Sequence, residues 1–118
     1  DYPTPDGTCV RDYVHVLDLA DAHERALQRL SPGDCVEVNL GSGQGTSVLE
    51  IVEQAREITG QPIPADLAER RPGDPPRLIA NNHRARMELA WEPTHSDLET
   101  ILSSAWDWHR NHPHGYAQ

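Results

Sequence analysis

Two short β-prone runs, each followed by apolar side chains at helical spacing, constrain the fold of this chain most strongly. Residues 10–16 form the first run and residues 36–40 form the second. Parallel strands in one sheet need a long crossover between them, and that crossover is usually a right-handed helical connection. The sequence therefore predicts an α/β fold in which the two runs and the intervening helix form a parallel βαβ unit.

Residue types that favour helix ends mark where the two helices begin and stop. Asp18 is the expected N-cap of the first helix, and Ser47 with Glu50 forms a capping-box pattern at the start of the second. Gly60 follows the second apolar pattern, and glycine readily adopts the left-handed conformation that ends many helices. We therefore expect the second helix to stop at Gly60.

The second half of the chain contains a proline-rich connection followed by two further helices. Prolines recur between residues 62 and 76, which excludes a long helix there. We expect a short strand near residues 63–68 and then a polar turn. Asn82 is expected to cap a short helix, and Ser96 is expected to cap the last, amphipathic helix.

The size and charge of the chain exclude several classes of function. Its 118 residues are the size of one domain. All ten basic residues are arginine, and 19 acidic residues bring the net charge to −9. This balance argues against nonspecific binding to nucleic acid or to an anionic membrane. Because no lysine is present, a Schiff base, a P-loop lysine and a Tyr-x-x-x-Lys pair are all excluded.

The cysteines and the start of the chain bear on location and completeness. Cys9 and Cys35 do not have the spacing of a zinc site or a redox motif. The sequence contains no secretory segment and no apolar run of membrane length, so we expect a cytoplasmic protein. It starts without methionine in a stretch rich in turn-forming residues, which suggests a part of a longer protein.

Arginines near a polar turn are the best candidates for binding an anion. Arg11 opens the first β-prone run, and Arg70, Arg71 and Asp74 lie together in the later turn. A guanidinium offers a planar, bidentate fork to phosphate or carboxylate and stays charged at any working pH. The alternative interpretation is ordinary surface ion pairing in an acidic chain. The residue types alone leave both open.

Other motifs have a weaker functional interpretation. Residues 41–45 are glycine-rich and lie between an expected strand and helix, as in dinucleotide-binding folds. The third glycine is one position early for that fingerprint, and no acidic residue follows about 20 positions later, so we expect a tight turn. His109, His112 and His114 lack the spacing of a metal triad, and no serine or cysteine nucleophile pattern is present. We therefore assign no metal-binding, cofactor-binding or catalytic residue.

Several stretches together resemble one family along nearly the whole chain. The sequence resembles the C-terminal third of UDP-glucose 4-epimerases, which belong to the extended short-chain dehydrogenase/reductase superfamily. Matching stretches occur in the family's order at residues 7–16, 18–23, 39–43, 70–74, 88–91 and 108–116.

The resemblance implies that residues 1–118 are one C-terminal UDP-sugar-binding region whose βαβ unit completes a Rossmann domain. The full-length enzyme would be a homodimer that interconverts UDP-glucose and UDP-galactose in galactose metabolism. NAD would be held by an N-terminal domain that is absent from this sequence, so this part alone would be inactive. We also expect exposed apolar surface, because a βαβ unit needs cover on both faces.

The resemblance also assigns roles to four residues. Arg11 and Arg71 would clasp the UDP diphosphate, Asp74 would accept hydrogen bonds from the ribose hydroxyls, and Tyr13 would line the same pocket. Two other interpretations stay open: a part of a related nucleotide-sugar epimerase or dehydratase, and a noncatalytic α/β binding module.

Overall fold

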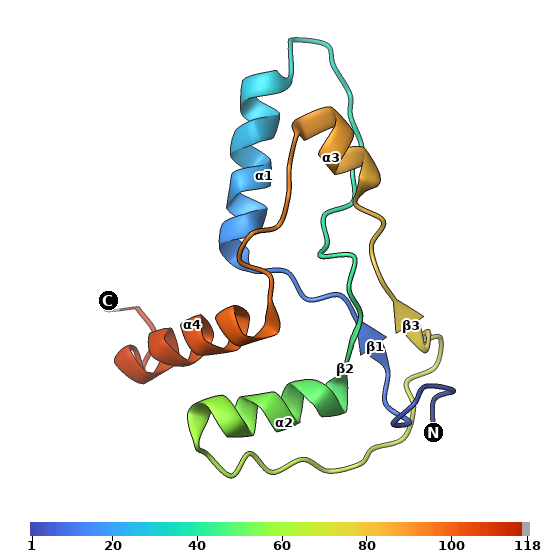
Figure 1. Cartoon of the computed structure of the whole chain (residues 1–118), viewed down its shortest axis with the longest axis vertical. Coiled ribbons are helices and arrows are strands. Elements are labelled where there is room, and N and C mark those ends of the chain that lie inside the picture. Colours follow the sequence, from blue (N-terminus) through green and yellow to red (C-terminus); the bar gives the residue numbers. More distant parts are fainter. Residues whose placement is uncertain (117–118) are drawn as a thin grey trace.

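A small sheet and two pairs of helices make up the computed structural model, which describes residues 1–116. Helix α1 packs beside α3 and helix α2 packs beside α4, at opposite ends of the molecule (Figure 1). The elements in chain order are β1 (Val10–Arg11), α1 (Val16–Arg29), β2 (Thr46–Ser47), α2 (Val48–Thr59), β3 (Arg77–Leu78), α3 (His83–Leu89) and α4 (Leu98–Asn111).

The sheet has three short strands in the order β2-β1-β3. Strand β1 pairs antiparallel with β2, where Val10 lies opposite Ser47, and parallel with β3, where Val10 lies opposite Arg77. The α/β class predicted from the sequence is therefore confirmed. Between the parallel pair β1 and β3, the chain passes through both α1 and α2.

The predicted pairing of residues 36–40 with residues 10–16 is not formed by the described part of the chain. Residues 36–40 alternate between half-buried and exposed side chains, as a strand with one covered face would. Val38 and Leu40 pack against the core, but no strand of the described chain lies beside this segment to accept its hydrogen bonds. Residues 63–68 also form no strand, and β3 begins later, at Arg77.

Two predicted helix ends are confirmed in atomic detail. The Ser47 side chain accepts from the backbone N–H of Glu50, and the Glu50 carboxylate accepts from the Ser47 N–H at 2.7 Å. Gly60 ends α2 with a φ of 65°. Asn82 precedes α3 as expected, but its side chain does not cap the helix and instead donates to the carbonyl of Gly41 at 2.7 Å.

Two other predicted caps are wrong. Helix α1 starts at Val16, so its N-cap is His15, whose Nδ1 accepts from a backbone N–H two residues on at 3.0 Å. Asp18 lies inside the first turn of α1 and is buried. Helix α4 is capped by Asp97, whose side chain accepts from the third helical N–H, and not by Ser96. Asp18 and Ser96 instead bind each other, because the Ser96 hydroxyl donates to the Asp18 carboxylate.

The core is small and lies between α1 and α3. Its buried members are Ala22, Ala85, Leu89 and Trp91. Helices α2 and α4, all of whose residues the structure describes, contain no fully buried residue. An amphipathic helix ordinarily buries its apolar stripe against another element, so this pair of helices lacks part of its cover. Among the described residues, no helix is long and apolar enough to cross a membrane.

Candidate functional site

The polar turn and the first strand meet at an ion pair. Arg11 on β1 pairs through Nη2 with the Asp74 carboxylate, and the hydroxyl of Tyr2 donates to the same carboxylate at 2.8 Å. The two paired side chains are 22% and 29% exposed, so water and a ligand can reach both. Arg11 and Asp74, which are 63 positions apart in the sequence, therefore contact each other at one accessible point.

The electrostatics of this cluster keep Asp74 ionised. The hydrogen bond from Tyr2 and the positive charges of Arg11 and Arg71 hold the pKa of Asp74 below its ordinary value, although partial desolvation acts against them. The same hydrogen bond to Asp74 raises the pKa of Tyr2, so the phenol stays protonated and remains a donor. Arg71 is exposed, and its positive charge also lowers the pKa of Asp74.

The two adjacent arginines of the turn differ in what they contact. The Arg70 guanidinium lies 4.1 Å from the centre of the Tyr2 ring, and its Nε pairs with the Asp1 carboxylate at 2.6 Å. None of the ion pairs among the described residues includes Arg71. Arg70 therefore holds the opening loop, whereas Arg71 forms no ion pair with a described residue.

Tyr13 lies a short distance along the chain from Arg11 and is half-buried. It lines a cavity of about 120 Å³ that also contacts Ser42, Thr46 and Asp97. Burial raises the pKa of Tyr13, and the nearby Arg11 charge acts in the opposite direction. The structure thus pairs Arg11 with Asp74, leaves Arg71 exposed in the same turn as Asp74, and places Tyr13 at a cavity that Arg11 does not line.

The glycine-rich turn does not fit a dinucleotide. The Asp12 carboxylate accepts from the backbone N–H groups of Ser42 at 2.8 Å, Gly43 at 3.0 Å and Ala80 at 3.1 Å. A Cβ at Gly41 would lie 2.4 Å from the Ala80 Cβ and 2.5 Å from the Asp12 Oδ2. The Asp12 carboxylate therefore occupies the N–H groups that a pyrophosphate would need, and the turn serves to connect neighbouring segments of the chain.

A second carboxylate, which the sequence interpretation took for a helix cap, is the centre of a buried network. Asp18 is 2% exposed and accepts from the backbone N–H groups of Thr94 at 3.1 Å and His95 at 2.9 Å, and from the Ser96 hydroxyl. Burial alone would raise the pKa of Asp18, but these hydrogen bonds outweigh it and lower the pKa to about 2. Asp18 thus ties α1 to the loop before α4.

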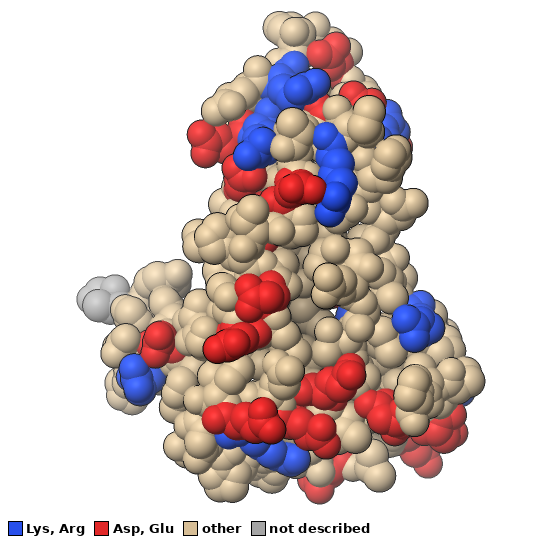
Figure 2. All heavy atoms as spheres, viewed as in Figure 1, with Lys and Arg blue, Asp and Glu red and all other residues tan. Residues whose placement is uncertain are grey.

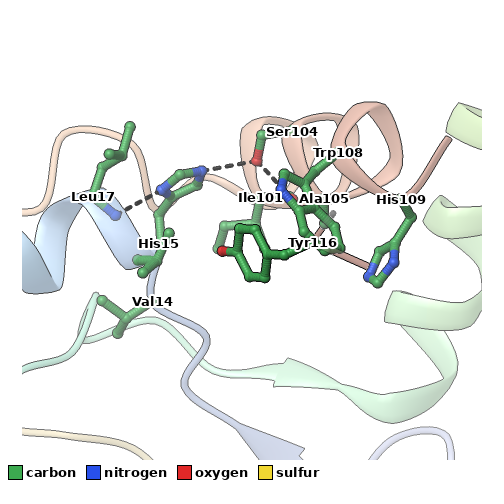
Figure 3. A pocket seen from close by; sticks show the side chains of 10 residues that line it. Val14, His15, Leu17, Ile101, Ser104, Ala105, Trp108, His109 and Tyr116 are labelled. Carbon is green, nitrogen blue, oxygen red and sulfur yellow. Dashed lines mark hydrogen bonds between the residues drawn. The ribbon is translucent and has the colours of Figure 1, made fainter. Parts of the chain in front are cut away.

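One further pair has the composition of a catalytic dyad but the wrong hydrogen bonds. The His15 Nε2 lies 2.8 Å from the Ser104 Oγ (Figure 3). Because Nδ1 accepts from the Leu17 N–H, neutral His15 carries its proton on Nε2 and donates it to Ser104. The Ser104 hydroxyl in turn donates to the Ile101 carbonyl at 3.1 Å. His15 therefore cannot accept the Ser104 proton, as a general base would.

The histidines near the C-terminus pack against an aromatic ring. The His112 ring stacks on Trp108 at 4.9 Å between centroids, and His109 meets the same ring edge-on at 5.1 Å. In the described residues, no group of three or more His, Cys, Asp and Glu side chains is placed to hold a metal ion.

Comparison with known proteins now identifies the family. The family model described as GDP-mannose 4,6 dehydratase matches residues 3–104. The chain belongs to this family. It is 52% identical over 118 residues to a UDP-glucose 4-epimerase from Halalkalibacterium halodurans, covering 99% of this chain and 35% of that protein. It is 57% identical over 106 residues to the UDP-glucose 4-epimerase of Corynebacterium glutamicum, covering 90% of this chain and 32% of the relative.

Solved structures agree with the sequence relatives. A crystal structure of UDP-glucose 4-epimerase superposes with a TM-score of 0.91 at 49% identity, covering 100% of this chain and 36% of that chain. The UDP-glucose 4-epimerase of Bifidobacterium longum, in complex with NAD+ and UDP, gives a TM-score of 0.90 at 38% identity. The match covers 98% of this chain and 34% of that chain. The chain thus spans about a third of the length of these relatives. The predicted resemblance to UDP-glucose 4-epimerases is confirmed, and the coverage is consistent with the C-terminal part of an extended short-chain dehydrogenase/reductase.

Proposed function

We propose that residues 1–118 are the UDP-sugar-binding region of an NAD-dependent UDP-glucose 4-epimerase. The observation that carries this proposal is 52% identity to such an enzyme over 99% of the chain. The Bifidobacterium longum neighbour was solved with NAD+ and UDP, which supports the same ligands here. The whole enzyme would interconvert UDP-glucose and UDP-galactose, as part of galactose metabolism, and would act as a homodimer.

NAD is proposed to bind outside this sequence, in an N-terminal domain. Asp12 already holds the N–H groups of the glycine-rich turn, so the residues described here offer no pyrophosphate cradle at that turn. The chain also lacks any lysine for the proton-transferring Tyr-x-x-x-Lys pair. NAD would supply the oxidation and re-reduction at C4 of the sugar, and this region would position the nucleotide.

The diphosphate is proposed to bind between Arg11 and Arg71. Both guanidiniums can offer planar, bidentate forks, and Arg71 has the exposure to meet an incoming anion. Arg11 is already oriented, since its Nη1 donates to the Val10 carbonyl at 2.7 Å and its Nη2 pairs with Asp74. A preoriented cation loses less side-chain freedom when a ligand binds.

Asp74 is proposed to accept from the ribose hydroxyls. Its lowered pKa keeps it a pure acceptor at neutral pH, and the Tyr2 hydrogen bond fixes its orientation. A carboxylate repels phosphate, so its place beside two arginines fits a position next to the diphosphate rather than on it. Although Tyr13 lines a cavity that Arg11 does not line, its protonated, half-buried ring is proposed to form part of the wall of the nucleotide pocket.

A cytoplasmic location is also proposed. Cys9 and Cys35 are both free in the structure, as expected where thiols stay reduced. A dehydratase is the second candidate function, because the matching family model carries the description GDP-mannose 4,6 dehydratase.

A chimeric enzyme tests these proposals. Residues 1–118 would replace the matching third of the Halalkalibacterium halodurans relative, and UDP-galactose would be supplied with NAD. We expect conversion to UDP-glucose by the chimera and none above a blank by residues 1–118 alone. Loss of water from a nucleotide sugar would identify a dehydratase instead. Epimerisation by the purified chain alone, free of host enzyme, would contradict the proposed division of labour.

A further inference from the structure

Tyr2 is a functional candidate that the residue types alone did not reveal. Its hydroxyl donates to Oδ2 of Asp74 at 2.8 Å, and Arg11 pairs with Oδ1 of the same carboxylate through its Nη2. Each oxygen of Asp74 therefore holds one donor of the protein. An ionised carboxylate has about four lone-pair sites, so about one site on each oxygen stays open for the hydroxyl of a ligand.

The two donors that hold Asp74 differ in how firmly they can stay in place. The torsion that turns a carboxylate about its Cβ–Cγ bond is broad, so one donor on each oxygen is needed to fix it. Arg11 is also proposed to bind the diphosphate, which competes with Asp74 for the same guanidinium. Tyr2 is a neutral phenol and a weaker partner for a diphosphate than a guanidinium is. Its hydrogen bond to Asp74 therefore persists when the nucleotide binds.

The charge around this site makes the orientation of Asp74 matter. The chain has a net charge of −9, and acidic side chains are numerous at the end of the molecule that carries α2 and the N-terminus (Figure 2). A carboxylate that turned toward the diphosphate would add to this repulsion. One that is held toward the ribose instead accepts hydrogen bonds from its hydroxyls.

The opening loop fixes Tyr2 through its backbone. The Tyr2 N–H donates to the Gly7 carbonyl at 3.0 Å, and the Tyr2 carbonyl accepts from the Thr4 N–H at 2.8 Å. The Thr4 hydroxyl in turn donates to the Thr8 carbonyl at 2.6 Å. The half-buried Tyr2 side chain is thus oriented before a ligand arrives, which lowers the entropy that binding costs.

We infer that Tyr2 determines the preference of this site for nucleotides that carry ribose hydroxyls, because its hydroxyl keeps Asp74 in place while Arg11 binds the diphosphate. This inference rests on the proposed function, and it names the residue on which ribose recognition depends. Tyr2 is a positioning residue, since it acts through Asp74. Its hydroxyl therefore matters only for a nucleotide whose ribose hydroxyls reach that carboxylate.

Two nucleotides that differ only in these hydroxyls test the inference. UDP and 2′,3′-dideoxy-UDP would be titrated by calorimetry into the chimera described above, with and without Tyr2→Phe, which removes the hydroxyl and keeps the ring. The variant should weaken UDP binding by about three- to tenfold and change 2′,3′-dideoxy-UDP binding by less than about twofold. In an Asp74→Ala background, Tyr2→Phe should change UDP binding by less than about twofold, because the group it acts through is gone.

Tyr116→Phe is the matched control, because Tyr116 is 82% exposed and lines the cleft between α1 and α4, outside the Asp74 cluster. It should leave the ratio of the two affinities unchanged. Tyr2→Leu repeats the test if Tyr2→Phe does not fold. Equal weakening of both nucleotides by Tyr2→Phe overturns the inference, as does unchanged UDP binding. If the unsubstituted chimera binds UDP but does not distinguish the two nucleotides, the proposed contact of Asp74 with the ribose is rejected as well.

Discussion

Asp18 and Asp74 are two carboxylates with lowered pKa values, and they differ in where their hydrogen-bond donors lie. Asp18 is 2% exposed, and the residues that bind it belong to one internal loop, residues 94–96. Asp74 is 29% exposed and contacts the side chains of Arg11 and Tyr2. The positive charge of Arg71 also lowers the pKa of Asp74. Asp18 therefore stabilises the fold, whereas Asp74 has an accessible partner, Arg11, that the proposed nucleotide ligand could replace.

The largest expected effect comes from removing Asp18. Asp18→Ala leaves the Ser96 hydroxyl and the backbone N–H groups of Thr94 and His95 without their acceptor. These hydrogen bonds are partly buried, and a hydrogen bond to a charged group contributes about 1.5–3 kcal/mol, so the free energy of unfolding should fall by at least about 3 kcal/mol. Urea denaturation followed by circular dichroism measures this loss.

Asp21→Ala is the matched control for that experiment. Asp21 lies on the same helix, but its pair with Arg25 joins side chains that are 42% and 40% exposed. Such an i, i+4 pair contributes only about 0.3–0.5 kcal/mol. Equal losses for the two variants would mean that the Asp18 network adds no more to stability than a surface pair does.

The next effect tests the accessible carboxylate cluster in the chimera. Arg71→Ala removes a charge-assisted contact to the diphosphate, and such hydrogen bonds contribute about 1.5–3 kcal/mol. UDP binding should therefore weaken by about ten- to a hundredfold, with little change in the unfolding free energy. Calorimetric titration of UDP gives the first quantity and urea denaturation gives the second. A large loss of stability with unchanged UDP affinity would reverse the roles assigned to the two regions.

Local sequence signals predicted local features well. The capping box of Ser47 and the left-handed Gly60 follow from residue types only a few positions apart, and the structure shows both. The alternation at residues 36–40 is also present, but a strand needs a neighbour, and none of the described residues supplies one. The strand predicted at residues 36–40 is therefore not formed by the described part of the chain.

Long-range contacts explain what the sequence could not predict. Asp18 has the residue type of a helix cap and a suitable position, so local rules favoured that role. Its actual partners lie more than 70 residues away, and no local pattern points to them. Arg11 and Asp74 also lie far apart in the sequence. Residue types made them candidates without deciding between ligand binding and surface pairing, the family resemblance implied roles at one ligand, and the structure shows them in contact.

Lowering the pH should reduce the contribution of Asp18 to the free energy of unfolding. The pKa of Asp18 is about 2 in the folded chain against an ordinary value of 3.8, so folding favours the ionised form. Its contribution, on the order of 2 kcal/mol, is present above about pH 4 and is lost as the pH falls toward 2. We expect the difference in unfolding free energy between wild type and Asp18→Asn to shrink by about that amount between about pH 5 and pH 2. A constant difference over this range would show that Asp18 does not titrate with folding.

The smallest expected effect separates the two neighbouring arginines. Arg70 is held by Asp1 and by the Tyr2 ring, and the Tyr2 hydroxyl reaches Asp74 without help from Arg70. Because exposed ion pairs contribute only about 0–1 kcal/mol, Arg70→Ala should weaken UDP binding by less than about threefold in the same calorimetric titration. A loss equal to or larger than that of Arg71→Ala would assign the diphosphate clamp to Arg70. If neither variant lost affinity, the Asp74 cluster would be ordinary solvated surface, and its contrast with Asp18 would be one of burial alone.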